Sequence, residues 1–216
     1  MAMALASTPA LADDACGSLV NNYGPFDYRT DRTKLPIVEH HHFTPQVEML
    51  LRGESNAYFE GDLIYTLNAF PNHHRALAAL IKLAERTHAR RPPRMDRSID
   101  CYFERAIRWR PDDVIVRMLH ADYLIKMGSP DEAAVQLAFV VENGGDNPLT
   151  YHNAGLLYLK LGRLEEAAAQ ARKARELGYP RTDLIDQLRA QGAWRDEAEP
   201  GSAAASAPSA ASAASR

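Results

Sequence analysis

A repeated unit in its second half constrains this 216-residue chain more than any other feature of its sequence. The interval from Gly128 to Gly162 is the same as the interval from Ala133 to Ala167. In both copies two acidic residues precede this alanine and a second alanine follows it. A period of about 34 residues has room for two helices, so it predicts a solenoid in which each helix pair buries its apolar face against its neighbours.

The copy nearest the C-terminus resembles the tetratricopeptide repeat family. The residues that carry the resemblance are Tyr151, Ala154, Gly155 and Tyr158 in a first helix, Ala167, Ala171 and Ala174 in a second, and Pro180 after it. The preceding copy departs from the family pattern at His120, where leucine is usual, and at Gly145, where proline is usual. The resemblance covers roughly residues 44 to 194 and implies an all-α fold, a right-handed α-solenoid of helix-turn-helix repeats.

The rest of the chain is divided by its position relative to these repeats. The predicted segments are a signal-peptide remnant at 1–12, an irregular N-terminal arm at 13–43, a degenerate repeat at 44–73, a repeat with an inserted loop at 74–113, two repeats at 114–147 and 148–181, a capping helix at 182–195 and a disordered Ala/Ser-rich tail at 196–216. Proline follows a capping residue at Ser129–Pro130 and at Asn147–Pro148, which supports two helix starts. In the degenerate repeat we expect helices over 44–56 and 61–71, the second being shortened.

The resemblance to this family implies a concave groove, lined by the first helix of each pair, that binds peptides or partner helices. Mapping by the phase of the repeat predicts that the partner-binding residues are Lys82, Met118, Asp122, Ile125, Lys126, His152, Asn153, Leu156, Leu159 and Lys160. Such a surface has an apolar floor and a basic border, which suits a partner with apolar anchors and some acidic residues. The alternative is that the apolar members of the set pack against a neighbouring helix, because a phase error of one residue has this effect.

The first twelve residues carry no charge and end in Ala10-Leu11-Ala12, directly before two aspartates. This order is typical of an export-signal cleavage site, so we expect a mature N-terminus at Asp13 and a periplasmic or secreted protein. The basic residues that begin such a signal are missing, so a cytoplasmic protein with an alanine-rich N-terminus is the alternative.

The segment 21–29 contains three aromatic residues and has no helical period. We expect it to lie on the helical body, with the end of the groove as one place for it, because aromatic rings gain from burial. In an oxidising compartment Cys16 of this arm could form a disulfide with Cys101, but the sequence leaves open whether the two are close.

Five histidines form the one cluster of candidate metal ligands in the sequence: His40, His41, His42, His73 and His74. If residues 40–42 were extended, His40 and His42 would point to one side and could bind zinc or copper with a third imidazole. No metal-binding spacing accompanies them, and capping or interface roles explain them more simply. We therefore predict no metal and no cofactor.

Composition excludes several classes of function. A net charge of −3 provides no global basic field for nucleic acid, and no internal run of uncharged apolar residues is long enough to span a membrane. Catalytic motifs such as a nucleophile elbow or a phosphate-binding glycine loop are also missing, so we expect no catalytic residues and no small-molecule substrate. A local excess of arginine at 90–97 could bind an acidic partner or lipid phosphates, although a solvated loop is the simpler explanation.

Taken together, the sequence predicts a non-enzymatic scaffold or assembly factor of the cell envelope that binds a protein or peptide in the repeat groove. Two alternatives stay open: a cytoplasmic adaptor that resembles a co-chaperone, and an envelope protein that binds a metal through the histidine cluster.

Overall fold

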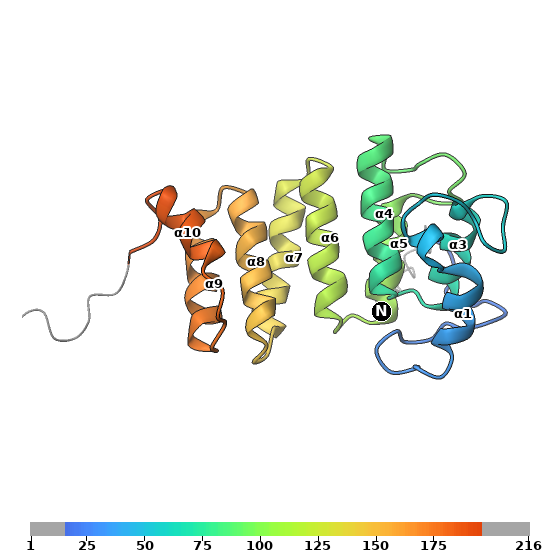
Figure 1. Cartoon of the computed structure of the whole chain (residues 1–216), viewed down its shortest axis with the longest axis horizontal. Coiled ribbons are helices and arrows are strands. Elements are labelled where there is room, and N and C mark those ends of the chain that lie inside the picture. The colour runs from blue at the N-terminus through green and yellow to red at the C-terminus, as the bar shows by residue number, and fades with distance from the viewer. Residues whose placement is uncertain (1–15, 196–216) are drawn as a thin grey trace, which may run out of the picture.

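The computed structural model describes residues 16–195, which form helices and connecting segments without any strand. The helices are α1 (Leu35–His42), α2 (Pro45–Glu48), α3 (Phe59–Ala69), α4 (His74–Thr87), α5 (Ile99–Trp109), α6 (Val114–Lys126), α7 (Pro130–Asn143), α8 (Pro148–Lys160), α9 (Leu164–Glu176) and α10 (Asp183–Ala190). Figure 1 shows that α4, α6, α8 and α10 follow one another along the long axis of the molecule. This arrangement confirms the predicted α-solenoid. The predictions for residues 1–12 and 196–216 lie outside the described residues, and no helix within 16–195 has the length and apolarity that a bilayer crossing requires.

The repeated glycines form the tight turns within two helix pairs. Gly128 and Gly162 have backbone φ angles of +75° and +71°, a conformation that glycine adopts without a steric penalty. The next backbone N–H then donates back into the preceding helix, from Ser129 to the carbonyl of Leu124 at 2.9 Å in the first turn. The chain therefore reverses direction sharply, and the two helices of each pair pack antiparallel.

The repeated alanines lie where the helices of a pair cross closely. Ala133 and Ala167 are fully buried. A Cβ atom placed on Gly155 of α8 would lie 3.3 Å from the backbone oxygen of Ala167 in α9, which shows how near the two helices approach. A side chain larger than methyl at position 167 would force them apart.

The N-terminal part differs from the sequence-based expectation in two places. Residues 35–42 of the predicted irregular arm form helix α1, because Leu35 and Val38 on one face of it pack against Phe70. In the degenerate repeat the first helix, not the second, is the short one: α2 ends at Glu48, and Leu50 has a φ of +59° that cannot continue a helix. The expected helix over 44–56 is therefore wrong.

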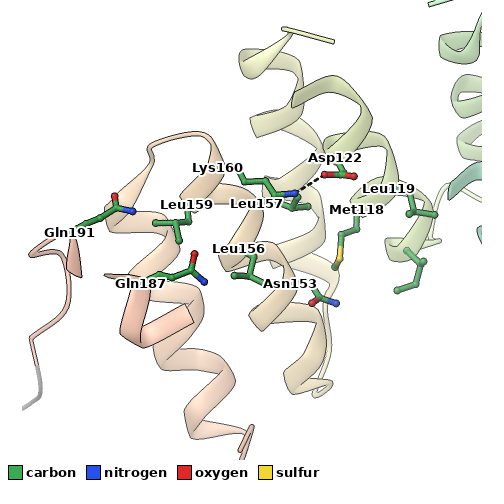
Figure 2. Close-up of a pocket in the computed structure, with 11 residues that line it drawn as sticks. Met118, Leu119, Asp122, Asn153, Leu156, Leu157, Leu159, Lys160, Gln187 and Gln191 are labelled. Atoms are coloured by element: carbon green, nitrogen blue, oxygen red, sulfur yellow. Dashed lines mark hydrogen bonds and ion pairs between the residues drawn. The ribbon is translucent and has the colours of Figure 1, made fainter. Parts of the chain in front are cut away.

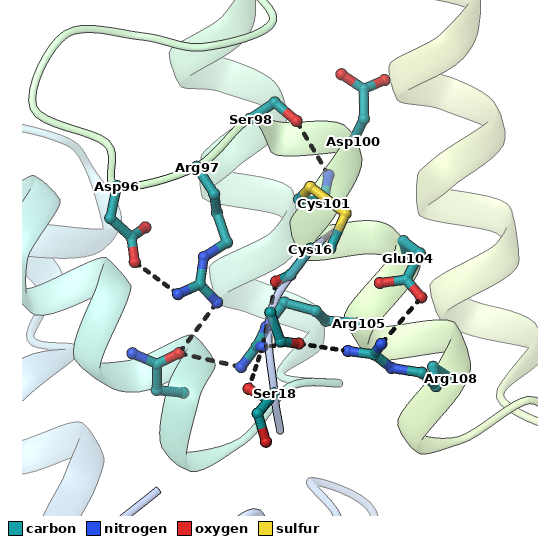
Figure 3. Close-up of a disulfide and its surroundings, with 12 residues drawn as sticks. Cys16, Ser18, Asp96, Arg97, Ser98, Asp100, Cys101, Glu104, Arg105 and Arg108 are labelled. Atoms are coloured by element: carbon teal, nitrogen blue, oxygen red, sulfur yellow. Dashed lines mark hydrogen bonds and ion pairs between the residues drawn. A yellow bond between two sulfur atoms is a disulfide. The ribbon is translucent and has the colours of Figure 1, made fainter. Parts of the chain in front are cut away.

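The arm at 16–34 lies along α3 and α5, not over the groove end. The backbone N–H of Phe26 donates to the carbonyl of Ala69 at 2.8 Å, and the indole N–H of Trp109 donates to the carbonyl of Phe26 at 3.2 Å. A disulfide joins Cys16 to Cys101 near the start of α5 (Figure 3). Next to it the buried guanidinium of Arg105 donates to the carbonyls of residues 17 and 18 at 3.0 and 2.5 Å.

A buried polar network fastens the middle of the arm to two inter-helix loops. The side-chain amide of Asn72 donates to the carboxylates of Asp27 and Asp113, at 2.8 and 2.9 Å. Arg29 and Arg110 donate to Asp27 from the side that faces solvent. Burial by itself would raise the pKa of Asp27, but the hydrogen bonds from Arg29 and Asn72 hold it well below its usual range. Asp27 therefore stays ionised and keeps its partners at any physiological pH.

His120 is a mostly buried residue of α6 that faces α5. Its ring stacks on that of Phe103, with the ring centroids 4.8 Å apart. Its Nδ1 atom is buried and meets no hydrogen-bond partner within residues 16–195. Burial lowers the pKa of His120 from 6.5 to about 4, so the imidazole is neutral at pH 7.

We expect Ala167→Leu to lower the free energy of unfolding by about 1–3 kcal/mol, because the larger side chain overpacks the crossing of α8 and α9. Ala169→Leu on the exposed face of the same helix is the matched control and should change it by less than about 0.5 kcal/mol. Urea unfolding followed by circular dichroism measures both. Equal effects of the two substitutions would contradict the close crossing.

Replacing both cysteines, in the variant Cys16→Ser/Cys101→Ser, should cost about 3–5 kcal/mol of stability, because the disulfide closes a loop of 85 residues in the unfolded chain. Guanidinium unfolding of the wild-type protein with and without a reductant provides the comparison. The reductant should destabilise the wild type to the same extent and leave the variant unchanged. A variant as stable as the oxidised protein would rule this contribution out.

The buried imidazole also predicts a pH dependence. The unfolded chain binds a proton at His120 below pH 6.5, whereas the folded chain does so only near pH 4. The free energy of unfolding therefore decreases as the pH is lowered from 6.5 to 4. This pKa difference corresponds to a loss on the order of 3 kcal/mol. His120→Leu should remove that part of the decrease, as measured by urea unfolding at pH 7 and pH 4. Parallel pH profiles for variant and wild type would disprove the role of His120.

Candidate functional site

A groove lies between α6, α8 and α10 and encloses a cavity of about 650 Å³. Its lining residues are Ile115, Met118, Leu119 and Asp122 from α6, Asn153, Leu156, Leu157, Leu159 and Lys160 from α8, and Gln187 and Gln191 from the C-terminal helix and the residue after it. Figure 2 shows Leu156 and Leu159 between the α6 side chains and Gln187. The groove therefore has three walls, one from each successive first helix of the solenoid.

The floor of the groove is apolar and firmly supported. Leu156 and Leu159 are half-buried, and both pack against the main hydrophobic core. Met118 is 8% exposed and belongs to that core, while its side chain still reaches the cavity. The floor residues are thus held in place by the fold before any ligand arrives, and the half-buried leucines leave apolar surface in contact with water.

The rim of the groove contains ion pairs, in place of the basic border expected from sequence. Lys160 of α8 contacts Asp122 of α6 at 3.0 Å, and Lys126 contacts Asp122 at 3.1 Å and Glu85 at 3.0 Å. Burial by itself would lower the pKa of Lys126, but the hydrogen bonds to Glu85 and Asp122 raise it overall. Because each lysine already has a carboxylate partner, the border carries little excess positive charge.

The structure brings six of the ten predicted partner-binding residues to this cavity: Met118, Asp122, Asn153, Leu156, Leu159 and Lys160. Lys126 belongs to the rim pairs, and Ile125 packs against the core instead of lining the cavity. Lys82 is exposed on α4 and is not among the lining residues. His152 is 3% exposed, and its ring packs on the tilted ring of Tyr179, with the ring centroids 4.3 Å apart. Because this ring is buried outside the groove, the prediction that His152 binds a partner there is wrong. Burial also lowers the pKa of His152.

The sequence analysis missed the contribution of the last helix. Gln187 and Gln191 were assigned to a capping helix, but they line the groove. Gln187 stands one repeat period after Asn153, so extending the repeat phase into the capping helix would have identified it. Leu119 stands one repeat period before Asn153 and also lines the cavity.

The lining groups determine what the groove can do chemically. Among the lining residues the charged pair Asp122 and Lys160 neutralise each other, and the remaining polar groups are three carboxamides, those of Asn153, Gln187 and Gln191. A carboxamide both donates and accepts hydrogen bonds, so it can pair with a peptide group. The groove therefore offers apolar contact and hydrogen bonds, and its lining contains no acid–base pair that is free to act on a substrate.

The histidine cluster is dispersed by the fold. His42 lies at the end of α1, not in an extended segment, and its Nδ1 atom is 2.8 Å from the carboxylate of Asp62. His73 contacts Glu39 at 3.2 Å, and His74 contacts Asp113 at 2.9 Å. In the part of the chain that the structure describes, no three His, Cys, Asp or Glu side chains are grouped to hold a metal. The expectation that His40 and His42 share one side of an extended segment is wrong, because α1 is helical.

The arginines of the inserted loop are also largely occupied. Arg90 pairs with Asp100, and Arg97 pairs with Asp96 at 2.7 Å. Arg94 lies over the ring of Tyr58, with its Cζ atom 4.0 Å from the ring centroid. These contacts tie the loop to its neighbours and reduce the basic surface that the sequence indicates.

Comparison with known protein families finds a match over one helix pair. A model of the family described as tetratricopeptide repeat matches residues 149–177, a range that spans the pair formed by α8 and α9. No curated protein and no solved structure matches the chain. Repeats of this family generally mediate interactions between proteins. The match shows that the α8–α9 pair is similar to a tetratricopeptide repeat, and the repeat period and the stacked helix pairs are consistent with repeats of this type in the neighbouring pairs.

Proposed function

We propose that this protein is a non-enzymatic scaffold or assembly factor that binds an apolar segment of a partner protein in the groove between α6, α8 and α10. The observation that carries the proposal is the cavity of about 650 Å³, whose floor is formed by half-buried Leu156 and Leu159 of α8 and by Met118 of α6. A cavity of this size is in the usual range for ligand sites and can hold two or three side chains of a peptide.

The groove suits a partner with apolar anchors. Each leucine or phenylalanine side chain that a partner buries there contributes roughly 1.5–3 kcal/mol from the removal of apolar surface from water. The floor residues are already packed against the core, so little side-chain entropy is lost when the partner binds. The ion-paired rim favours a partner whose anchors are neutral, because both lysines already contact carboxylates.

A helix and an extended peptide are both compatible with an apolar floor, but the carboxamides favour the extended form. The side-chain carboxamides of Asn153 and Gln191 have no hydrogen-bond partner among residues 16–195, so both can pair with the free N–H and C=O groups of an extended main chain. In a helical segment the main-chain N–H and C=O groups already bond to one another, so few of them would be available to the carboxamides.

The compartment that we propose is the periplasm or the exterior of the cell. The disulfide between Cys16 and Cys101 supports an oxidising environment, since cytosolic thiols are kept reduced. The alternative is a cytoplasmic adaptor. Sequencing the N-terminus of the protein from its natural host separates the two, because export should leave Asp13 as the first residue.

Leu156→Glu tests the groove. The variant should weaken capture of the partner at least tenfold, because the partner would have to desolvate a carboxylate on the floor. A photocrosslinking amino acid at position 153, used in the natural host, identifies the partner, and the crosslinking yield with and without Leu156→Glu measures the effect.

Val135→Glu is the matched control for this experiment. Val135 is 66% exposed on α7 and does not line the groove, so the same change of an aliphatic residue to glutamate should leave the crosslinking yield unaltered. Both variants should melt within a few degrees of the wild type. Undiminished crosslinking in a folded Leu156→Glu variant would exclude the groove as the binding site.

A further inference from the structure

Two adjoining cavities lie in the N-terminal part of the molecule, far along the chain from the groove and formed by the arm, α1 and α3. The larger cavity, of about 370 Å³, is lined by Tyr23, Ile37, Val38, His41, His42, Ser55 and Tyr65. The smaller, of about 200 Å³, is lined by Asn21, Asn22, Tyr23, Tyr65, Asn68 and Ala69. Because Tyr23 and Tyr65 line both cavities, the two are direct neighbours, at the end of the molecule where α1 and α3 lie (Figure 1).

The lining of this site is mostly apolar, with several uncharged polar groups, and carries no Asp, Glu, Lys or Arg side chain. A quarter of the residues in the chain are of these four types, so their exclusion from the combined lining is a clear property of the site. A strongly charged ligand would find no Asp, Glu, Lys or Arg side chain in the lining with which to form an ion pair. The site therefore selects a neutral ligand.

Its aromatic walls are held rigidly. Tyr65 is 40% exposed, and its ring stacks on that of His42 with centroids 3.7 Å apart and planes inclined by 24°. His42 is fixed in turn by the buried carboxylate of Asp62. Tyr23 is held by an edge-to-face contact with Phe26, with centroids 5.0 Å apart. A ligand that stacks on these rings would not have to order them first.

Several hydrogen-bonding groups of the site are not used within residues 16–195. The hydroxyl of Tyr65 and the carboxamide of Asn22 meet no protein partner there. Asn68 uses its side-chain oxygen to accept from Arg105 at 3.2 Å, which leaves its amide nitrogen as a donor. An apolar ligand would leave these groups unpaired as it excluded water, at a cost of roughly 1–3 kcal/mol for each group.

We propose that these cavities bind a neutral saccharide. A sugar ring combines a flat face of C–H groups, which packs on an aromatic ring, with hydroxyl groups that both donate and accept hydrogen bonds. The two neighbouring cavities provide a place for consecutive rings, with Tyr65 between them. Peptides are usually recognised along a strand edge or a continuous apolar groove, whereas this site presents short cavities and side-chain polar groups.

The test uses the full-length protein and three soluble neutral trisaccharides: maltotriose, cellotriose and N,N′,N″-triacetylchitotriose. Saturation-transfer NMR detects weak binding through the ring protons of the sugar. At least one trisaccharide should give a saturable signal with a Kd of about 1 mM or tighter, and the signal should be strongest for C–H protons on one face of a ring. If none of the three trisaccharides gives a saturation-transfer signal, the proposal is overturned.

Variants locate the binding. Tyr65→Ala should weaken it at least tenfold by removing the stacking surface, and Tyr65→Phe, which keeps the ring, should weaken it only severalfold. Asn22→Ala is a second test of the site. Because Asn22 is exposed, the substitution should not disturb the fold, and it should also weaken binding severalfold. Leu156→Glu in the groove should have no effect, which separates this site from the proposed function.

Two results would assign the signal to something other than this site. Binding that persists unchanged in both Tyr65→Ala and Asn22→Ala would place the saccharide elsewhere on the molecule. Competition of the signal by a neutral peptide such as Gly-Tyr-Gly, at a concentration below that of the sugar, would show that the site prefers a peptide. Either result contradicts the proposal.

Discussion

The structure depends on the close crossing of helices at small side chains. A single amphipathic helix pair cannot bury its apolar face alone, so each pair needs a neighbour within packing distance. Ala167 provides this distance in the last pair, and the absence of a side chain at Gly155 does so on the opposing helix. The same crossing determines which residues remain for binding: one face of α8 packs on α9, and the adjacent face, with Leu156 and Leu159, lines the groove.

The apolar faces at the two ends of the solenoid are covered in different ways. At the C-terminal end α10 covers the last pair with buried Leu184 and Leu188, and its outer residues extend the groove. At the N-terminal end the arm and α1 cover α3 and α5, and the disulfide and the buried Asp27–Asn72–Asp113 network hold the arm there. Covalent and charged contacts replace a large apolar cap, because the arm has few aliphatic side chains with which to form one.

The two proposed binding sites lie at these two ends of the solenoid. The groove at the C-terminal end presents an apolar floor with a neutralised rim, which fits a protein segment. The cavities at the N-terminal end present tyrosine rings and uncharged polar groups, which fit a flat and neutral polar ligand. Because α4 and α5 stand between the arm and the groove, the two proposed sites are separate, and occupation of one would leave the other open.

By itself the sequence determined the repeat period, the helical class and most of the groove. Gly128, Gly162 and the repeated alanines are local requirements of turn geometry and close packing, so their spacing is readable without a structure.

Side-chain partners and the shape of the N-terminal part were decided by tertiary contacts. Nothing local to Lys160 indicates Asp122 as its partner, and His152 is drawn into a buried ring contact by Tyr179, which lies beyond the end of the next helix. Leu35 and Val38 become helical because Phe70 covers them, and the proximity of Cys16 to Cys101, 85 residues apart, exists only once the arm has docked on α5. Such pairings depend on the path of the whole chain, which no local pattern encodes.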